Sequence, residues 1–369
     1  NCLVETMRQS GEEQSGLVEW NGKPFLAVCV AGLRLTNLDL VALIPREMLM
    51  ESRIALEHRI RWCFLTALII GLTGATLLVH GLLTPVREVG QGIVALRNKN
   101  FHHRISHSGE DELGRLANAF NRLIETAEEM SVARVVQESL IPEAVPHLPG
   151  YDLAWKCRMS NALGGDYLDC FQLPENRLVF LVGDVSGHGI SSALVMAMAK
   201  SVVFLHFSEG GTPETLMPRM NHALFQLTLQ KQMMTFCFGF LDANQHEGFV
   251  IVAGNPFPYF FTPEENRART IGKGAYPLGA KAEGKFAAIP IIFSPGSSIL
   301  FYTDGLVEAL NRTGDPYGYD RLQISVERYA SLPASEQISA FSEDLDRHIG
   351  TIPLADDLSM LVLKRGKIS

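Results

Sequence analysis

The sequence lacks several features that would point to particular classes of protein. Its six cysteines are scattered and form no C-x-x-C pair, which argues against a zinc cluster or a disulfide framework. Only a Cys2–Cys29 bridge stays open, on the condition that the N-terminal segment is extracytoplasmic. No long basic run is present and the formal net charge is −8, so we expect no nucleic-acid partner. An initiator Met and a signal peptide are also missing, so we expect the 369 residues to be part of a longer protein.

One segment lacks charge altogether. Trp62 to Leu83 runs 22 residues without a charged side chain. As a helix this segment would be roughly 33 Å long, which is enough to cross the hydrocarbon core of a bilayer. The alternative is a buried core helix, but a soluble helix of this length normally shows a polar face. We therefore predict a transmembrane helix over 62–83. Basic residues flank the segment on both sides, so the positive-inside rule does not orient it.

Two amphipathic patterns follow the apolar segment. The first places apolar residues at 3-4-3 spacing, and the second repeats the pattern after "DEL". The residues are Val86, Val89, Ile93 and Leu96, followed by Leu113, Leu116, Phe120, Leu123 and Ala127. Asp111 and Glu112 stand where the N-terminus of a helix favours negative charge. Two short helices cannot each bury such a seam alone, so a four-helix bundle made by two chains is expected.

The apolar helix, Pro85 and the "DELG" sequence together resemble a HAMP domain over about 82–130. The resemblance implies a homodimer that relays a signal across the plasma membrane, with residues after the membrane helix in the cytoplasm. An ordinary helical linker is the alternative. We assign 84–130 to this relay and 131–149 to a signalling helix and linker. Residues 1–61, with two or three strands separated by Gly and Asn turns, would be the end of an extracytoplasmic sensor domain.

Residues 150–369 alternate strand-like runs with two helical blocks. The runs are "LVFLV", "MTFCFGFL", "GFVIVAG", "SSILFYT" and "LSMLVLKR", and the helical blocks are 191–207 and 213–229. Adjoining strands with helices gathered in pairs predict an α+β fold, a β-sandwich flanked by helices.

Four aspartates stand at the ends of apolar strands in this region. By the period of two, Asp184 shares a strand face with Phe180 and Val182, and Asp304 shares one with Leu300 and Tyr302. Asp356 is expected to open the last strand, and Asp166 follows two glycines. A buried carboxylate normally pairs, neutralises or binds a metal, and no Arg or Lys lies beside these acids in the sequence. All-oxygen ligands suit Mg²⁺ or Mn²⁺, so we predict a site for two such ions, although each acid alone would be an ordinary turn or cap residue.

The order of the local sequences also identifies a family. "ALGGDYLD", "VGDVSGHGISSAL", "VAGNPFP", "YTDGLVEALN", "YGYDRL" and "ADDLSMLVL" resemble the PPM-type (PP2C-like) serine/threonine phosphatases of the bacterial RsbU/SpoIIE branch. The resemblance implies that Asp184 bridges both metals beside the Val185 carbonyl, that Asp166, Asp304 and Asp356 complete the ligand set, and that Asp184 and Asp304 are catalytic. Asp357 and Asp169 would be peripheral. Asn255 and Ser297 depart from the family pattern, which often has His and Asp there.

The resemblance further implies the reaction and the substrate. A water activated by the two metals would attack the phosphorus of phosphoserine or phosphothreonine in line. The glycines after Asp184 would let the backbone approach the metals' waters. Ser186 stands where animal relatives have a His. His188, two residues further on, could act as the general acid, and the alternative is that it is an ordinary turn residue. The expected substrate is a phosphorylated STAS-type anti-sigma-factor antagonist. The rival functions are a receptor that only binds partners and a nucleotide hydrolase, against which the lack of a Gly-rich loop with Lys argues.

Overall fold

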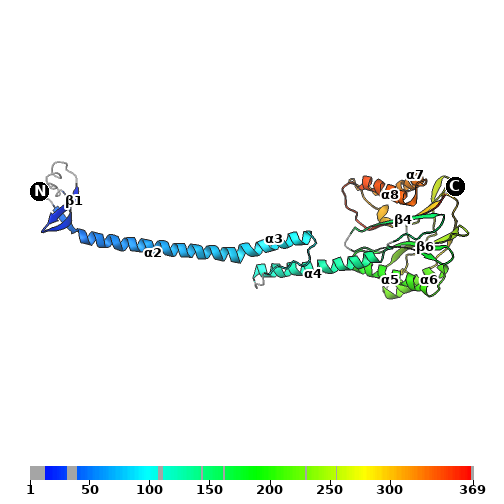
Figure 1. Ribbon diagram of the computed structural model, residues 1–369, viewed down its shortest axis with the longest axis horizontal. Coiled ribbons are helices and arrows are strands. Elements are labelled where there is room, and N and C mark those ends of the chain that lie inside the picture. Colours follow the sequence, from blue (N-terminus) through cyan, green and yellow to red (C-terminus); the bar gives the residue numbers. More distant parts are fainter. Residues whose placement is uncertain are drawn as a thin grey trace. The chain divides into compact units, whose positions relative to one another are not determined.

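The computed structural model describes residues 13–30, 40–106, 111–142, 144–160, 163–228, 231–254 and 256–366. The chain divides into two compact units, 1–124 and 125–369 (Figure 1). Cys29 is a buried free cysteine, whereas Cys2, its candidate disulfide partner, lies outside the described residues.

The first unit opens with a small antiparallel sheet in the order β1-β2-β3. Its strands are β1 (Gln14–Trp20), β2 (Lys23–Val30) and β3 (Leu40–Pro45). Asn21 and Gly22 both have positive φ (53° and 71°), which is the backbone that a tight two-residue hairpin requires. The Asn-Gly turn in the sequence therefore sets the register of β1 on β2.

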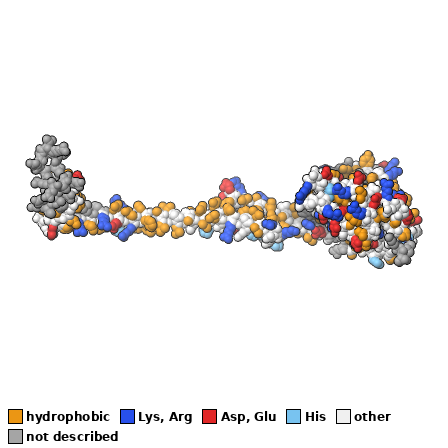
Figure 2. Space-filling model, turned by 90° about the horizontal axis from the view of Figure 1, so that it is seen from above, with side chains coloured by type: hydrophobic (Ala, Val, Ile, Leu, Met, Phe, Trp, Pro, Cys, Tyr) orange, Lys and Arg blue, Asp and Glu red, His pale blue; other side chains and the backbone are white. Residues whose placement is uncertain are grey.

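A long helical run follows the sheet. Helix α2 (Arg46–Leu78) continues through a π-helical turn η1 (Val79–Leu83) into α3 (Thr84–Arg97). Apolar side chains line this run on the face seen in Figure 2, and Phe64 and Ile70 are 72% and 71% exposed. Such exposure is not that of a core helix within the described chain, and the run is long and apolar enough to cross a membrane. Helix α2 begins at Arg46, well before the predicted start of the membrane segment at Trp62.

Helix α3 and the start of helix α4 (Glu112–Ser139) contact each other through small residues. The ring of Phe120 occupies the space where a side chain on Gly92 would lie, 2.7 Å from the ideal Cβ position. Asn121 holds the connector between the helices, because its amide bonds both the N–H and the carbonyl of Ile105 (2.9 and 3.0 Å). Asp111 caps α4 by accepting the N–H of Gly114 (2.8 Å), as the acidic start of this helix predicts.

The apolar seam expected from the 3-4-3 pattern stays largely uncovered within one chain. Val86 and Ile93 on α3 are 54% and 56% exposed, and Leu116 and Leu123 on α4 are 48% and 52% exposed. Residues that the single chain does bury in these helices include Pro85 on α3 and Ala117 and Ile124 on α4. The seam therefore needs a further surface to cover it, which agrees with the expected bundle of two chains.

The second unit contains two five-stranded antiparallel sheets. The first has the order β11-β8-β7-β6-β5 and the second the order β10-β9-β12-β13-β4. The first sheet consists of β5 (Asp166–Leu173), β6 (Arg177–Val185), β7 (Met234–Asp242), β8 (Glu247–Ala253) and β11 (Ile289–Ile292). The second consists of β4 (Tyr151–Arg158), β9 (Tyr259–Thr262), β10 (Arg267–Thr270), β12 (Ser298–Tyr302) and β13 (Leu358–Arg365).

The sheets face each other and helices cover both outer faces (Figure 1). Between the sheets, the rings of Phe180 and Phe301 pack with centroids 4.9 Å apart. Helices α5 (Ile190–Ser208) and α6 (Pro213–Leu227) cover the first sheet. Helices α7 (Tyr319–Tyr329) and α8 (Ala334–Ile349) cover the second. Strand β6 is apolar at successive positions because both of its faces are buried, and the predicted sandwich is confirmed.

Two details differ from the sequence prediction. The sequence analysis identified two helical blocks, whereas the second unit also has α7 and α8, whose buried apolar residues recur at helical spacing among polar and charged ones. Helix α5 is also long and apolar enough to pass as a membrane span. It buries Val195, Met196 and Ala199 against the first sheet, so it is a core helix of this unit.

Strand β7 offers a test of the packing between the sheets. A Cβ on Gly239 would lie 2.3 Å from the ring of Phe180, its partner on β6. We expect Gly239→Ala to lower the free energy of unfolding by about 1–3 kcal/mol, because a dense core cannot move the ring without strain. Urea unfolding followed by circular dichroism measures the change. Gly274→Ala is the control, since a Cβ there meets nothing within 4 Å, and equal stability of the two variants would contradict this packing.

Candidate functional site

The four predicted aspartates lie at one end of the sandwich, where strands of both sheets begin or end. Asp166 is the first residue of β5 and is the register partner of Asp184 near the end of β6. Asp304 begins a short 3₁₀ turn (η2, Asp304–Leu306) after β12, and Asp356 precedes β13 by two residues. The expectation that Asp356 opens the last strand is therefore not met in detail, since the strand starts at Leu358.

Two hydrogen bonds join the sheets at this end. The Thr303 hydroxyl, next to Asp304, donates to Asp166 Oδ2 (3.0 Å). The Gly165 N–H donates to Asp357 Oδ2 (2.9 Å). Asp357 is 4% exposed and also accepts the N–H of Ser160 (2.8 Å). The Asp357 side chain thus connects the residue before β5 to the residue before β13, which agrees with the peripheral position expected for it.

The aspartates raise one another's pKa values. Burial raises the pKa of Asp184 to about 8, and repulsion from Asp304 and Asp356 adds to the rise. The pKa of Asp166 is also well above its ordinary value, first because of burial and then because of Asp184. Burial raises the pKa of Asp304 as well, with contributions from Glu308 and Asp356. Burial is the larger cause of each shift, and the repulsion between neighbouring carboxylates adds to it.

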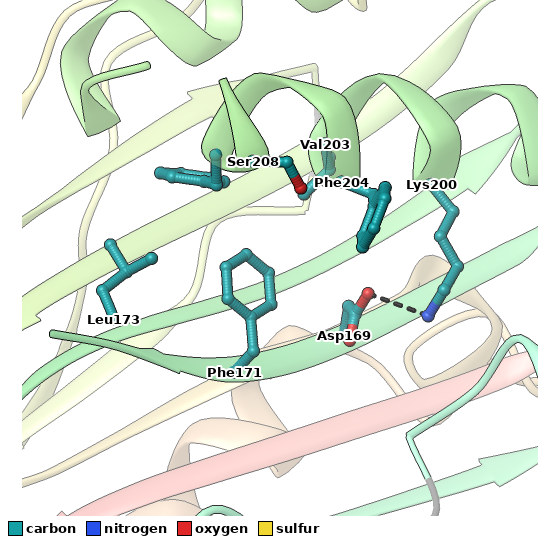
Figure 3. Close-up of a pocket in the computed structure, with 8 residues that line it drawn as sticks. Asp169, Phe171, Leu173, Lys200, Val203, Phe204 and Ser208 are labelled. Atoms are coloured by element: carbon teal, nitrogen blue, oxygen red, sulfur yellow. Dashed lines mark hydrogen bonds and ion pairs between the residues drawn. The ribbon is translucent and has the colours of Figure 1, made fainter. Parts of the chain in front are cut away.

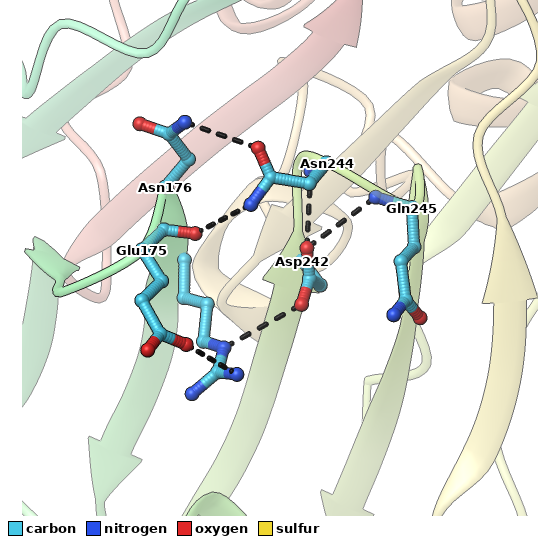
Figure 4. A network of polar contacts seen from close by, with 6 residues as sticks. Glu175, Asn176, Asp242, Asn244 and Gln245 are labelled. Atoms are coloured by element: carbon cyan, nitrogen blue, oxygen red, sulfur yellow. Dashed lines mark hydrogen bonds and ion pairs between the residues drawn. The ribbon is translucent and has the colours of Figure 1, made fainter.

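Asp242, at the opposite end of the same strands, is an aspartate whose side chain has hydrogen-bond and ion-pair partners. Asp242, at the end of β7, accepts the backbone N–H groups of Asn244 (3.0 Å) and Gln245 (3.3 Å) and lies 3.5 Å from Arg177 Nε (Figure 4). Asp166 Oδ1, in contrast, is buried without a hydrogen-bond partner among the described residues. The chain therefore satisfies its acids at one end of β6 and β7 and leaves them under-satisfied at the other.

The donor set fits a hard divalent cation by three observations. The donors are carboxylates and a backbone carbonyl, the orphaned Asp166 Oδ1 calls for a positive partner, and repulsion keeps carboxyl pKa values high. Gly165 lets the backbone come close to the donors, since a Cβ there would lie 2.8 Å from the Val185 carbonyl oxygen and 3.0 Å from Asp184 Oδ1. Among the described residues, however, no three Asp, Glu, His or Cys side chains are arranged as the ligands of one ion. The metal-ligand set of Asp166, Asp184, Val185, Asp304 and Asp356 therefore stays a prediction.

Other predicted residues have different roles. Asp169 is not part of the cluster. It forms an ion pair with Lys200 (3.0 Å) and accepts a hydrogen bond from the Tyr167 hydroxyl (2.9 Å). Ser186 accepts the N–H of Met233 (3.0 Å), and His188 is exposed on the loop before α5. Asn255 lies outside the described residues.

The glycines after Asp184 are required by the backbone conformation and not by close contacts with neighbouring atoms. Gly187 and Gly189 have φ of 92° and 86°, and a Cβ on either would meet nothing within 4 Å. The glycines that clear the site are Gly164, Gly165 and Gly305, where an ideal Cβ would meet Asp357, Val185 or Asp184 atoms within 3.0 Å. Sequence reasoning also missed Thr303 and the buried Gln137, which bonds Gly164. Thr303 adjoins Asp304 in the sequence, but nothing local marks Gln137.

Comparisons with known proteins agree with this arrangement. Residues 174–366, more than half of the chain, match the family of Stage II sporulation protein E (SpoIIE), and residues 77–129 match the HAMP domain. Phosphoserine phosphatase RsbU of Bacillus subtilis is 22% identical over 241 residues, covering 65% of this chain and 71% of that protein. Protein IcfG of Synechocystis is 21% identical over 354 residues. The match covers 82% of this chain but only 55% of IcfG.

Solved structures show the same fold. The RsbU and RsbW domains of a Mycobacterium tuberculosis protein are 29% identical with a TM-score of 0.52, covering 61% of this chain and 62% of that one. The SiaA-PP2C domain of Pseudomonas aeruginosa has a TM-score of 0.56 at 19% identity, covering 66% of this chain and 97% of that domain.

The charge imbalance predicts opposite effects of one substitution at the two ends of the sandwich. Without metal, we expect Asp184→Asn to raise the free energy of unfolding by roughly 1–3 kcal/mol, because it removes a buried acid whose neighbours repel it. Asp242→Asn should lower the free energy of unfolding, because it weakens the contact with Arg177. Thermal unfolding in the presence of a chelator measures both.

The pH dependence follows from the sign of the shift. Because the folded-state pKa of Asp184 is raised, its contribution to stability is present below the ordinary carboxyl pKa, about 4, and is lost as the pH rises toward about 8. The advantage of Asp184→Asn should therefore vanish near pH 4. A stabilisation by Asp184→Asn that is independent of pH would contradict the repulsion.

Proposed function

The chain belongs to the SpoIIE family of PPM-type phosphatases, and we propose that it removes phosphate from phosphoserine or phosphothreonine of a protein partner. The observation that carries the proposal is the group of mutually repelling carboxylates where the two sheets meet. Stability alone would favour replacing such a group, so its presence is best explained by a cationic cofactor and an anionic substrate.

Two Mn²⁺ or Mg²⁺ ions are the cofactors that this donor set would hold. Asp184 would bridge them, with the Val185 carbonyl, Asp166, Asp304 and Asp356 as further ligands. When bound, such ions activate a water and offset the charge of a phosphoryl group.

The surrounding residues would position this set. Asp357 ties the start of β5 to the start of β13, which keeps Asp166 and Asp356 on facing sides. Thr303 fixes one oxygen of Asp166 and leaves the other available. Gly165 allows the loop before β5 to approach the Val185 carbonyl and Asp184 closely, because any side chain there would collide with them. His188, exposed on the loop that follows Asp184, is the candidate that would protonate the leaving serine or threonine oxygen.

A protein partner in sigma-factor control is the substrate class we propose. The curated relative RsbU, 22% identical over 241 residues, is named a phosphoserine phosphatase, and the sequence motifs of this chain resemble the RsbU/SpoIIE branch. A phosphorylated STAS-type anti-sigma-factor antagonist is therefore the first candidate. The rival nucleotide hydrolase and the rival non-enzymatic receptor are decided by the assay below.

The first unit would anchor and regulate this activity at the plasma membrane. We propose that α2 spans the bilayer, that the second unit is cytoplasmic, and that the HAMP segment forms a homodimer. The exposed seam on α3 and α4 supports the dimer, because it leaves apolar residues without cover within one chain. A signal received before α2 would then reach the second unit through α4.

The activity itself is tested with metal and substrate. The full chain in detergent should release phosphate from a phosphorylated STAS-type antagonist only with Mn²⁺ or Mg²⁺, and Asp184→Ala should reduce the rate at least about a thousandfold. Asp242→Asn, at the far end of the strands, is the matched control and should keep the rate. Phosphate release that persists in Asp184→Ala or in chelator would refute the mechanism. Preference for a nucleotide over phosphoproteins would favour the rival hydrolase, and a wild-type chain inert on every substrate would favour the receptor.

The dimer is tested by cross-linking. In a background with the exposed Cys63 replaced by serine, Leu123→Cys should form an intermolecular disulfide on mild oxidation, because Leu123 lies on the exposed seam. Glu125→Cys, two residues away and so on another face of α4, should cross-link far less. Equal cross-linking at both positions, or none at either, would contradict a dimer through this seam. Non-reducing electrophoresis gives the result.

A further inference from the structure

Gln137 is a buried glutamine near the end of α4 that the proposed reaction does not use directly. It is 3% exposed, and its side-chain amide makes two hydrogen bonds to the backbone of one residue, Gly164. Nε2 donates to the Gly164 carbonyl (2.7 Å), and Oε1 accepts the Gly164 N–H (3.1 Å). Burying an amide is costly unless both of its ends are paired, and here both ends are paired with the same backbone position. Such a clamp fixes Gly164 more firmly than packing alone would.

Gly164 in turn touches the carboxylate cluster. A Cβ on Gly164 would lie 2.1 Å from Asp357 Oδ2, so only glycine fits between Gln137 and Asp357. The next residue, Gly165, donates to the same Asp357 oxygen (2.9 Å), and its carbonyl accepts the N–H of Val185 (3.3 Å). Asp166 follows immediately. The position of Gln137 therefore fixes the loop from which Asp166 starts and against which the Val185 backbone rests.

A second contact ties the end of the same helix to the same strand. The ammonium group of Lys200 on α5 donates to the carbonyl of Leu140, just after α4, and pairs with Asp169 on β5 (Figure 3). The end of α4 thus contacts the loop before β5 through Gln137 and the middle of β5 through Lys200. Helix α4 holds this strand at two points, and only the first point leads directly to the cluster.

We propose that Gln137 is a positioning residue for the metal site, acting through Gly164 and Gly165 on Asp166 and the Val185 carbonyl. The inference rests on the proposed function. Partners of metal ligands that do not touch the metal commonly alter metal affinity by about 10–100-fold when they are removed. The affinity for Mn²⁺ is accordingly set in part by a residue of α4, the helix that begins in the HAMP segment.

The test uses the full chain in detergent and Mn²⁺ as the probe. Gln137→Leu removes both hydrogen bonds at similar volume, and Glu138→Gln, an exposed neighbour, is the matched control. Free Mn²⁺ measured by electron paramagnetic resonance gives the binding constant directly. We expect Gln137→Leu to weaken Mn²⁺ binding at least about tenfold. At saturating Mn²⁺ its phosphate release should return to within about twofold of wild type, since Gln137 touches no reacting atom.

Each outcome decides the matter. Wild-type Mn²⁺ affinity in Gln137→Leu would overturn the inference, and so would a loss of rate at saturating Mn²⁺ with unchanged affinity. If Gln137→Leu does not fold, Gln137→Glu carries the test, because it keeps the acceptor for the Gly164 N–H but loses the donor to the Gly164 carbonyl. Its Mn²⁺ affinity should fall below that of wild type, and an unchanged affinity would overturn the inference. A wild-type chain that binds no Mn²⁺ would instead overturn the proposed function, and this inference with it.

Discussion

The second unit is organised around a repulsion. Asp166 and Asp184 are register partners on neighbouring strands, and turns from the opposite sheet bring Asp304 and Asp356 toward them. Burial next to other carboxylates raises the pKa values of these aspartates and lowers the free energy of unfolding when they are ionised. The rest of the sandwich has to supply that free energy through the aromatic core between the sheets and the two helical layers. The neutralised Asp242 at the other end of β7 shows that the fold itself does not require unpaired acids.

Much of this arrangement could be predicted from the sequence. The run from Leu178 to Val182 is apolar at every position because β6 is covered on both faces, so its type and place were readable. Helices α7 and α8 were missed although their apolar residues recur at helical spacing, as Ile338, Phe341, Leu345 and Ile349 do on the buried face of α8. Asp184 could be assigned to a strand face by periodicity. The same assignment for Asp304 and Asp356 was wrong in detail, because both lie outside their strands and reach the cluster through turns.

The contacts that hold the site were harder to predict than the candidate ligands themselves. Gln137 and Gly164 are 27 positions apart in the sequence, and neither residue type is unusual where it stands. The need for glycine at 164 arises from Asp357, which is far away along the chain. Such requirements are set by the meeting of distant segments, and only coordinates show them. Local patterns identified what could carry chemistry, while tertiary contacts decide how firmly it is held.

The π-helical turn from Val79 to Leu83 has a consequence for modular exchange. A π turn closes its hydrogen bond one residue later than an α turn, so one extra residue is accommodated without breaking the helix. One residue corresponds to about 100° of rotation in an α-helix. The facing of α3 relative to α2 thus depends on this single wide turn. A chimera that grafts a foreign receptor segment onto this chain must keep the residue count across the turn, or the downstream helix will present the wrong side.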